Sequence, residues 1–296
     1  MTHLPFPPTD TWHNLLSLAL AEDIGPGDVT SRLTIAADER GRAQIEARQE
    51  LIVCGLPLLG ELFRRVEPEL HLELLNEDGK TVKSGAPLVR IEGPIRGILS
   101  GERTALNFMA RLSGVATSTR RYVEAVAGTG VQIVDTRKTL PGWRMLDKYA
   151  VATGGGVNHR IGLFDGILLK DNHVASAGGV GRATRLARDN APANLTVQVE
   201  VESLEQARDA WENGADLLLL DNRSPEEIRK IAAEAPERLI LEASGGITLA
   251  NVRAYSECGV HRVSIGALTH SAPGVDLALE MLPTPSQTAA RDASRE

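Results

Sequence analysis

Aromatic residues are scarce in this chain, making up 3% of its 296 residues. Proteins that bind single-stranded nucleic acid stack bases on aromatic side chains, so this scarcity argues against that class. Basic residues are also in the minority, because 32 lysines and arginines face 39 aspartates and glutamates and the net charge is −7. Nucleic-acid binding calls for a broad basic face. We therefore expect no nucleic-acid partner.

Cysteine and long apolar runs are lacking too. The two cysteines, Cys54 and Cys258, show no CxxC spacing, so we interpret them as reduced core thiols rather than a disulfide or a zinc site. The N-terminus has prolines and Asp10 where a signal peptide would need a basic start and an apolar run. No apolar run approaches the roughly twenty residues of a membrane span. These absences predict a soluble cytoplasmic protein with no membrane partner.

From about residue 130 to 270 the chain alternates short apolar runs with amphipathic segments. Two of the amphipathic segments begin with helix caps, Ser203 and Ser224, and Ser224 is followed by Pro225 and two glutamates. The apolar runs suit parallel strands buried on both faces, and the last of them end about 22 residues apart. The expected strands are Val131–Asp135, Gly166–Lys170, Thr196–Glu200, Leu217–Asp221, Leu239–Ser244 and Val263–Gly266. This alternation predicts an α/β fold with a (β/α) barrel.

The first hundred residues lack this rhythm and predict a separate α+β, sandwich-like domain. Its expected strands are Arg42–Ala47, Leu51–Cys54, Leu70–Leu75 and Leu88–Glu92. A helix over about Ser100–Val126 is expected to link the two parts, with Gly114 breaking it where the barrel begins. We therefore predict an N-terminal domain over residues 1–113 and a barrel over 114–284, whose end is able to pack back on the first domain. A disordered tail is expected over 285–296.

Polar groups recur where the predicted barrel strands end. They are Asp135, Lys170, Glu200, Asp221, Ser244-Gly245-Gly246 and Ser264-Ile265-Gly266. Active sites of (β/α) barrels collect at the C-terminal ends of the strands, and phosphate is often bound after the last two. Small residues there let backbone N–H groups approach an anion. The pattern predicts an anion-binding site at this end of the barrel.

A cationic cluster lies in the same part of this acidic chain. It consists of Arg137, Lys138, His159, Arg160 and Lys170. Cations among apolar runs need a partner of opposite charge. An arginine side chain can grip a carboxylate or a phosphate at two points, whereas a lysine acts as a point charge. The cluster predicts a pocket for a small anion that carries several charges.

Several of these residues have more than one interpretation. Lys170 can bind an anion, serve as the Schiff-base nucleophile of an aldolase-type barrel, or simply extend from a strand end. Glu200 and Asp221 can hold Mg²⁺ together with substrate phosphates, act as general acid and base, or neutralise the cations; we favour Mg²⁺. Arg103 and Asn107 lie one helical turn apart and, taken alone, indicate an ordinary exposed helix face.

Taken together, these segments resemble the quinolinate phosphoribosyltransferase family. The similarity runs from Glu22 to His270, and its most specific parts are Gly101–Asn107, Asp135–Thr139, Gly154–Arg160 and Leu169–His173. The resemblance implies an N-terminal α/β sandwich joined to an incomplete barrel, in a homodimer that stands alone or in higher assemblies. It implies a pentosyltransferase of NAD biosynthesis, which converts quinolinate and phosphoribosyl pyrophosphate to nicotinate mononucleotide, pyrophosphate and CO₂ with Mg²⁺.

The resemblance also assigns roles by position. Arg137, Lys138 and Arg160 would bind the two carboxylates of quinolinate, with Thr136 and His159 beside them. Arg103 would reach in from the neighbouring subunit, which replaces its interpretation as an ordinary helix face. Lys170 would contact the substrate or pyrophosphate, and Glu200 and Asp221 would hold the ribose and Mg²⁺. The residues expected to act in catalysis are Lys138, Lys170, Glu200 and Asp221. The residues expected at the 5′-phosphate are Ser244, Gly245, Gly246, Ser264, Ile265 and Gly266, with His270 assisting.

Two other classes stay open at this point. One is a Schiff-base aldolase that uses Lys170 on the same barrel. The other is a non-catalytic binding protein or a paralogous phosphoribosyltransferase, for example one that serves molybdenum uptake.

Overall fold

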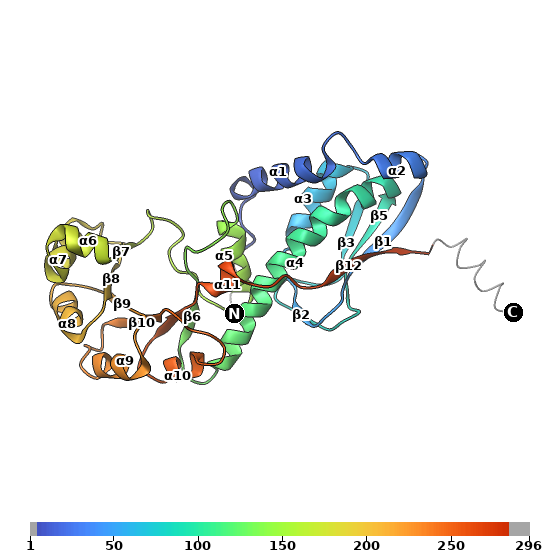
Figure 1. The fold of residues 1–296 in the computed structure, drawn as a ribbon. Coiled ribbons are helices and arrows are strands. Elements are labelled where there is room, and N and C mark those ends of the chain that lie inside the picture. The colour runs from blue at the N-terminus through green and yellow to red at the C-terminus, as the bar shows by residue number, and fades with distance from the viewer. Residues whose placement is uncertain (1–4, 284–296) are drawn as a thin grey trace. The chain divides into compact units, whose positions relative to one another are not determined.

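The computed structural model describes residues 5–283, which separate into two compact units (Figure 1). Unit 1 comprises Met1–Ser118, Pro141–Gly154 and Ala272–Glu296, and unit 2 comprises Thr119–Leu140 and Gly155–Ser271. The chain thus passes into unit 2 a few residues after the expected boundary at 113/114 and returns twice to unit 1. The tail expected over 285–296 lies outside the described residues.

Unit 1 is built on a four-stranded antiparallel sheet with the order β12-β1-β5-β3. Ile45 of β1 pairs with Leu279 of β12 on one side and with Val89 of β5 on the other. The C-terminal strand therefore completes the sheet of the N-terminal part of the chain. The strands are β1 (Arg40–Ala47), β3 (His71–Leu74), β5 (Pro87–Pro94) and β12 (Leu277–Leu282), with a separate pair of β2 (Leu51–Ile52) and β4 (Thr81–Val82).

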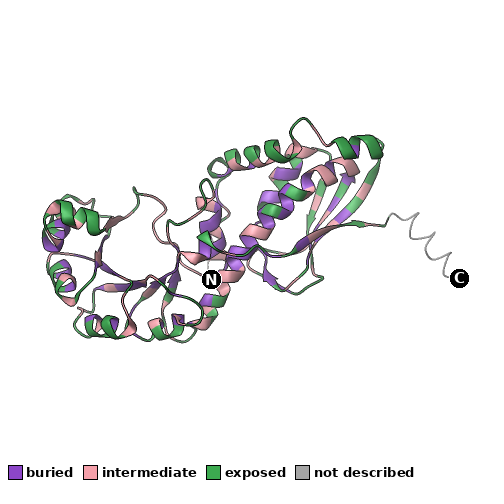
Figure 2. Ribbon diagram, viewed as in Figure 1, coloured by how far each residue is buried: buried purple, intermediate pink, exposed green. Residues whose placement is uncertain are grey.

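Helices complete unit 1, and their buried residues face inward (Figure 2). α3 buries Leu58, Leu59, Leu62 and Phe63 on one side, as expected for an amphipathic helix that covers a sheet. The helical elements of this part of the chain are η1 (Thr9–Thr11), α1 (His13–Ile24), α2 (Val29–Thr34), α3 (Leu56–Val66), α4 (Ile95–Ala125) and α5 (Arg144–Thr153). No helix among residues 5–283 is both long and apolar enough to cross a bilayer.

The predicted break of the linking helix at Gly114 is wrong. α4 runs without interruption from Ile95 to Ala125. A Cβ atom at Gly114 would lie 2.2 Å from the carbonyl oxygen of Pro273, which approaches this face of the helix within unit 1. The glycine therefore permits a close contact with a distant segment of the chain, and it does not end the helix.

We predict that Gly114→Ala destabilises the protein by about 1–3 kcal/mol, because the Pro273 backbone would have to move away from the new methyl group. Gly60 in α3 is the matched control, since no atom lies within 4 Å of a Cβ built there. Gly60→Ala should raise stability by about 0.5–1 kcal/mol through helix propensity. Urea unfolding of both variants measures the difference, and a stabilised Gly114→Ala would contradict the close contact.

Unit 2 contains a six-stranded parallel sheet with the order β6-β11-β10-β9-β8-β7, and all six strands predicted for this region are confirmed. Its strands are β6 (Gln132–Val134), β7 (Ile167–Leu169), β8 (Val197–Val201), β9 (Leu217–Asp221), β10 (Ile240–Ser244) and β11 (Arg262–Ser264). Its helices are α6 (Asp171–Ala177), α7 (Val180–Asn190), α8 (Leu204–Glu212), α9 (Pro225–Ala232), α10 (Val252–Ser256) and α11 (Ala267–His270).

The sheet of unit 2 forms an incomplete (β/α) barrel, with α6 to α10 outside the strands (Figure 1). A parallel bridge between Val134 and Val157 adds a further position beside β6. No strand pairing joins this position to β7 within the described residues, so the ring of strands stays open there. The two predicted helix caps are confirmed, because Ser203 accepts from the N–H of Gln206 and Ser224 from that of Glu227.

Candidate active site

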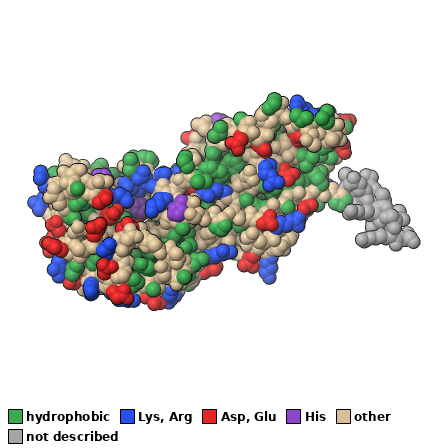
Figure 3. All heavy atoms as spheres, in the orientation of Figure 1, with side chains coloured by type: hydrophobic (Ala, Val, Ile, Leu, Met, Phe, Trp, Pro, Cys, Tyr) green, Lys and Arg blue, Asp and Glu red, His purple; other side chains and the backbone are tan. Residues whose placement is uncertain are grey.

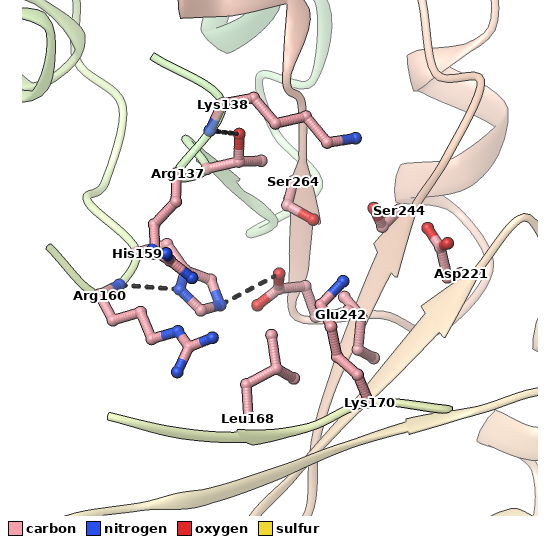
Figure 4. A pocket seen from close by; sticks show the side chains of 12 residues that line it. Arg137, Lys138, His159, Arg160, Leu168, Lys170, Asp221, Glu242, Ser244 and Ser264 are labelled. Carbon is pink, nitrogen blue, oxygen red and sulfur yellow. Dashed lines mark hydrogen bonds and ion pairs between the residues drawn. The ribbon is translucent and has the colours of Figure 1, made fainter. Parts of the chain in front are cut away.

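A cavity of about 310 Å³ lies at the C-terminal ends of the parallel strands of unit 2. Nine of its twelve lining residues are among those that the sequence singled out (Figure 4). The lining residues are Thr136, Arg137, Lys138, His159, Arg160, Leu168, Lys170, Leu219, Asp221, Glu242, Ser244 and Ser264. Basic side chains and a histidine also gather on the visible face of unit 2 in the space-filling view (Figure 3). The structure therefore brings most of the candidate residues into one cavity.

The segment after β6 places Arg137 and Lys138 at the cavity. The backbone N–H of Lys138 donates to Thr136 Oγ1 at 3.0 Å, and its carbonyl accepts from Thr269 Oγ1 at 2.9 Å. Asp135 is fully buried just before them and accepts the backbone N–H of His159 at 2.8 Å. These contacts hold the Thr136–Lys138 turn to the neighbouring segments while its cationic side chains line the cavity.

Arg160 is the second arginine of the cavity. Its Nη1 donates to the carbonyl of Gly166 at 2.9 Å. Burial lowers the pKa of the Arg160 guanidinium, and the positive charge of Arg137 lowers this pKa further against the opposing effect of Asp165. The two guanidinium groups therefore repel each other. An anion bound between them would relieve this repulsion.

Lys170 and Glu200 form an ion pair at the end of β7 and β8, with Nζ 3.3 Å from Oε2. Glu200 is paired with Leu219 in the sheet, so Asp221 lies two residues further along β9 toward the strand ends. One oxygen of Asp221 accepts from Asn222 Nδ2 at 3.0 Å. The two carboxylates thus belong to adjacent strands. Asp221 lines the cavity, whereas Glu200 does not line it and is joined to it through Lys170, which does.

These two carboxylates fit Mg²⁺ only in part. Among the described residues, no three His, Cys, Asp or Glu side chains gather closely enough to hold a metal ion. Mg²⁺ commonly takes one or two protein carboxylates and completes its shell with water and substrate phosphates. The donor set of Glu200 and Asp221 is therefore suited to a metal that arrives with a phosphorylated substrate.

Small residues follow β10 at the cavity rim. Gly245 has φ of 91°, and a Cβ there would lie 2.2 Å from Asn222 Oδ1, so only glycine fits this turn. Gly246 has φ of 62°, and no atom lies within 4 Å of a Cβ built there. The turn after Ser244 therefore leaves open space beside its backbone, as a phosphate-binding loop requires.

The turn after β11 is more crowded. A Cβ on Gly266 would lie 3.0 Å from the Lys138 side chain and 3.2 Å from that of His270. His270 is exposed, and its Nδ1 lies 2.5 Å from Ser271 Oγ. Ile265 is buried, and its N–H donates to the carbonyl of Val134 at 2.9 Å, so that group is not available to a phosphate. Of these three residues, Ser264 lines the cavity, whereas Ile265 and Gly266 do not.

Arg103 lies in unit 1 on α4, outside the residues that line the cavity. Its side chain is 64% exposed, and its Nη2 lies 4.0 Å from Oε1 of Glu102. Such an exposed arginine is free of any strong structural pairing with Glu102.

Sequence reasoning missed three lining residues: Leu168, Leu219 and Glu242. Glu242 is the chemically important one, because its side chain is 1% exposed and neither carboxylate oxygen has a hydrogen-bond partner among the described residues. The signal was present in the sequence. Side chains alternate along a strand, so a glutamate two residues before Ser244 in an apolar run points into the same cavity.

Comparison with known protein families shows which family this chain belongs to. Residues 28–113 match the model of the quinolinate phosphoribosyl transferase N-terminal domain, and residues 115–280 match that of the C-terminal domain. The chain belongs to the quinolinate phosphoribosyltransferase family. This membership confirms the resemblance inferred from the motifs around Arg137, His159 and Lys170.

Relatives of this family align over nearly the whole chain. A probable nicotinate-nucleotide pyrophosphorylase [carboxylating] of Bacillus subtilis is 42% identical over 267 residues, covering 90% of this chain and 92% of that protein. The corresponding protein of Mycobacterium leprae is 41% identical over 281 residues, covering 92% and 98%. The solved structure of the nicotinate-nucleotide pyrophosphorylase from Francisella tularensis has a TM-score of 0.89 at 38% identity, covering 93% and 98%. The quinolinate phosphoribosyltransferase fold is therefore shared over more than nine-tenths of this chain.

Proposed function

We propose that this chain transfers the phosphoribosyl group of phosphoribosyl pyrophosphate to quinolinate, giving nicotinate mononucleotide, pyrophosphate and CO₂ in NAD biosynthesis. The observation that carries this proposal is a single cavity that combines cations for a dicarboxylate with a turn suited to a phosphate, in a chain of the quinolinate phosphoribosyltransferase family. Arg137, Lys138 and Arg160 supply charges for a dicarboxylate, and the glycine turn after Ser244 leaves space for a phosphate. The Schiff-base alternative loses its support, because Lys170 is paired with Glu200 and the family matched is a phosphoribosyltransferase family.

The division of labour follows from charge and position. Arg137, Lys138 and Arg160 hold the pyridine ring by its carboxylates, with Thr136 and His159 beside them. Ser244, Gly245, Gly246, Ser264 and Gly266 hold the 5′-phosphate, with His270 at the rim. Glu200 and Asp221 hold the ribose, and they are the groups that would hold Mg²⁺. When bound, Mg²⁺ supplies positive charge to the pyrophosphate oxygens.

The chemistry then requires mainly orientation and placed charge. As the bond between C1 of the ribose and pyrophosphate breaks, the Glu200 and Asp221 carboxylates stabilise the positive charge that grows on C1, while Lys170 neutralises the leaving group. The ring nitrogen of quinolinate attacks C1. The positive charge then present on nitrogen stabilises the carbanion left when the adjacent carboxylate departs as CO₂, and a proton completes the product.

A substrate comparison tests this function. Purified protein with phosphoribosyl pyrophosphate and Mg²⁺ should form nicotinate mononucleotide from quinolinate and none from nicotinate, because nicotinate lacks the second carboxylate and would leave part of the cationic cluster without a counter-charge. Product can be measured by liquid chromatography with mass spectrometry. Formation of nucleotide from nicotinate at an equal rate would contradict the assignment of the cations to a dicarboxylate.

We further propose a cytoplasmic homodimer in which Arg103 completes the site of the neighbouring subunit. The exposure of the Arg103 side chain supports the proposal of a shared site, and two buried free thiols, Cys54 and Cys258, are typical of a reducing compartment.

Mixing two inactive variants tests the shared site. Arg103→Ala and Glu200→Gln homodimers should each be nearly inactive, whereas heterodimers would contain one site with both native residues. After unfolding and refolding of an equal mixture, we expect about a quarter of wild-type activity, because half of the dimers are hybrids and each has one complete site. Activity that stays at the level of the unmixed variants would contradict the shared site.

A further inference from the structure

The buried carboxylate of Glu242 has no role in the proposed reaction steps. Its side chain is 1% exposed, it lines the same cavity as Arg137 and Lys170, and both of its oxygens lack a hydrogen-bond partner among the described residues. A buried carboxylate without such partners is costly, so a position of this kind calls for a functional reason.

Glu242 faces the Nε2 edge of His159. Its Oε1 lies 3.7 Å from His159 Nε2 (Figure 4). The same nitrogen lies 2.9 Å from Gln198 Oε1. On the other edge of the ring, Nδ1 accepts the backbone N–H of Arg160 at 2.8 Å. Because a backbone N–H can only donate, the neutral ring carries its proton on Nε2, which donates to Gln198 and faces Glu242.

This arrangement links Glu242 to the arginine that follows the histidine. If the ring turned over, Nδ1 would no longer accept from the Arg160 backbone, and the segment that carries the Arg160 guanidinium would lose this anchor. The negative charge of Glu242 opposes such a turn because it attracts the Nε2 proton, and it opposes the other tautomer because it would repel an unprotonated Nε2. Glu242 and Gln198 therefore hold the Nε2 edge of the His159 ring in place. The ring in turn holds the Arg160 backbone through Nδ1.

We propose that Glu242 is a positioning residue that acts through His159 to hold the dicarboxylate-binding group of His159 and Arg160 in place. This inference rests on the proposed function, because it concerns the binding of quinolinate. Glu242 does not contact the carboxylates itself. We expect Glu242 to affect the binding of quinolinate and not that of phosphoribosyl pyrophosphate. The residues proposed to bind the 5′-phosphate lie on the turns after β10 and β11, and Glu242 contacts His159 instead.

Two variants of Glu242 test the proposal. Glu242→Gln removes the charge, and Glu242→Met replaces the buried carboxylate by an apolar side chain of similar length, which removes the cost of burying a carboxylate that makes no hydrogen bond. Both should raise KM for quinolinate about tenfold, the effect of weakening one charge-assisted hydrogen bond between Arg160 and a substrate carboxylate, with KM for phosphoribosyl pyrophosphate within twofold of wild type. Glu226→Gln, at a side chain that is 74% exposed on α9, is the matched control and should change neither constant.

A double-mutant cycle separates positioning from a general structural role. In a His159→Asn background, Glu242→Gln should raise KM for quinolinate by less than twofold, because the residue through which Glu242 acts is gone. A further tenfold rise there, or equal changes in both KM values, would overturn the proposal. Nitrogen-15 NMR of labelled histidine gives a readout that does not depend on turnover: wild type should show Nδ1 unprotonated and Nε2 protonated, and Glu242→Gln should show a mixture.

The outcomes distinguish this inference from the function on which it rests. Wild-type protein that forms no nicotinate mononucleotide from quinolinate refutes the proposed function. Wild-type turnover together with unchanged Glu242 variants leaves the function standing and refutes the role of Glu242 alone.

Discussion

Arg137→Ala is expected to lower kcat/KM for quinolinate by about 10²-fold while the protein folds normally. Truncating one partner of a hydrogen-bonded charge pair costs about 2–5 kcal/mol, and the exposed position of Arg137 places it near the lower end of that range. The loss should appear mainly as weaker quinolinate binding. KM for phosphoribosyl pyrophosphate should change little, because the glycine turn after Ser244 does not depend on Arg137.

Two further variants sharpen this prediction. Arg137→Lys keeps the charge but loses the planar pair of donors, so it should recover only part of the activity. Arg182→Ala removes an exposed arginine of α7 outside the cavity and should behave as wild type. Steady-state kinetics with quinolinate varied measures all three, and near-normal turnover by Arg137→Ala would refute its assignment to the substrate carboxylates.

Glu200→Gln and Asp221→Asn should each lower kcat by about 10²–10³-fold, the usual cost of removing one group that stabilises transition-state charge. Glu200→Gln has a second effect, because it also removes the partner of the Lys170 ammonium, 3.3 Å away. Both variants should need more Mg²⁺ for half-maximal rate at fixed phosphoribosyl pyrophosphate. A Mg²⁺ titration of the initial rate measures this shift.

The control for these carboxylates lies two residues away. Glu202 is exposed and is not the carboxylate that pairs with Lys170, so Glu202→Gln should leave both kcat and the Mg²⁺ requirement unchanged. If Glu200→Gln and Glu202→Gln gave the same rate within threefold, the account of Glu200 as a catalytic carboxylate would be wrong.

The parallel strands of unit 2 were predictable from the sequence for a simple reason. A strand buried on both faces must be apolar along its length, as Leu217–Leu220 is, and the polar residue that follows marks its end. The cationic cluster was predictable too, because Arg137 and Lys138 follow such an end directly. At these residues the hydrophobic pattern of the local sequence is enough to indicate where each residue lies in the fold.

Other features depend on contacts between distant parts of the chain. Gly114 suggested a helix break because glycine disfavours helices, yet the contact with Pro273 explains the residue and the helix continues. Ile265 was grouped with its neighbours as a phosphate contact, whereas the pairing of its N–H with Val134 is a property of the sheet. Glu242 went unnoticed because one glutamate does not disturb the apolar pattern of a strand.

The most direct test of the account is the fate of each carboxylate during turnover. Quinolinate labelled at the 2-carboxylate should release one labelled CO₂ for each nicotinate mononucleotide formed in the presence of phosphoribosyl pyrophosphate and Mg²⁺. Quinolinate labelled at the 3-carboxylate should retain its label in the nucleotide. Nucleotide formed without CO₂, or CO₂ released without nucleotide, would contradict the proposal that this cavity couples phosphoribosyl transfer to decarboxylation.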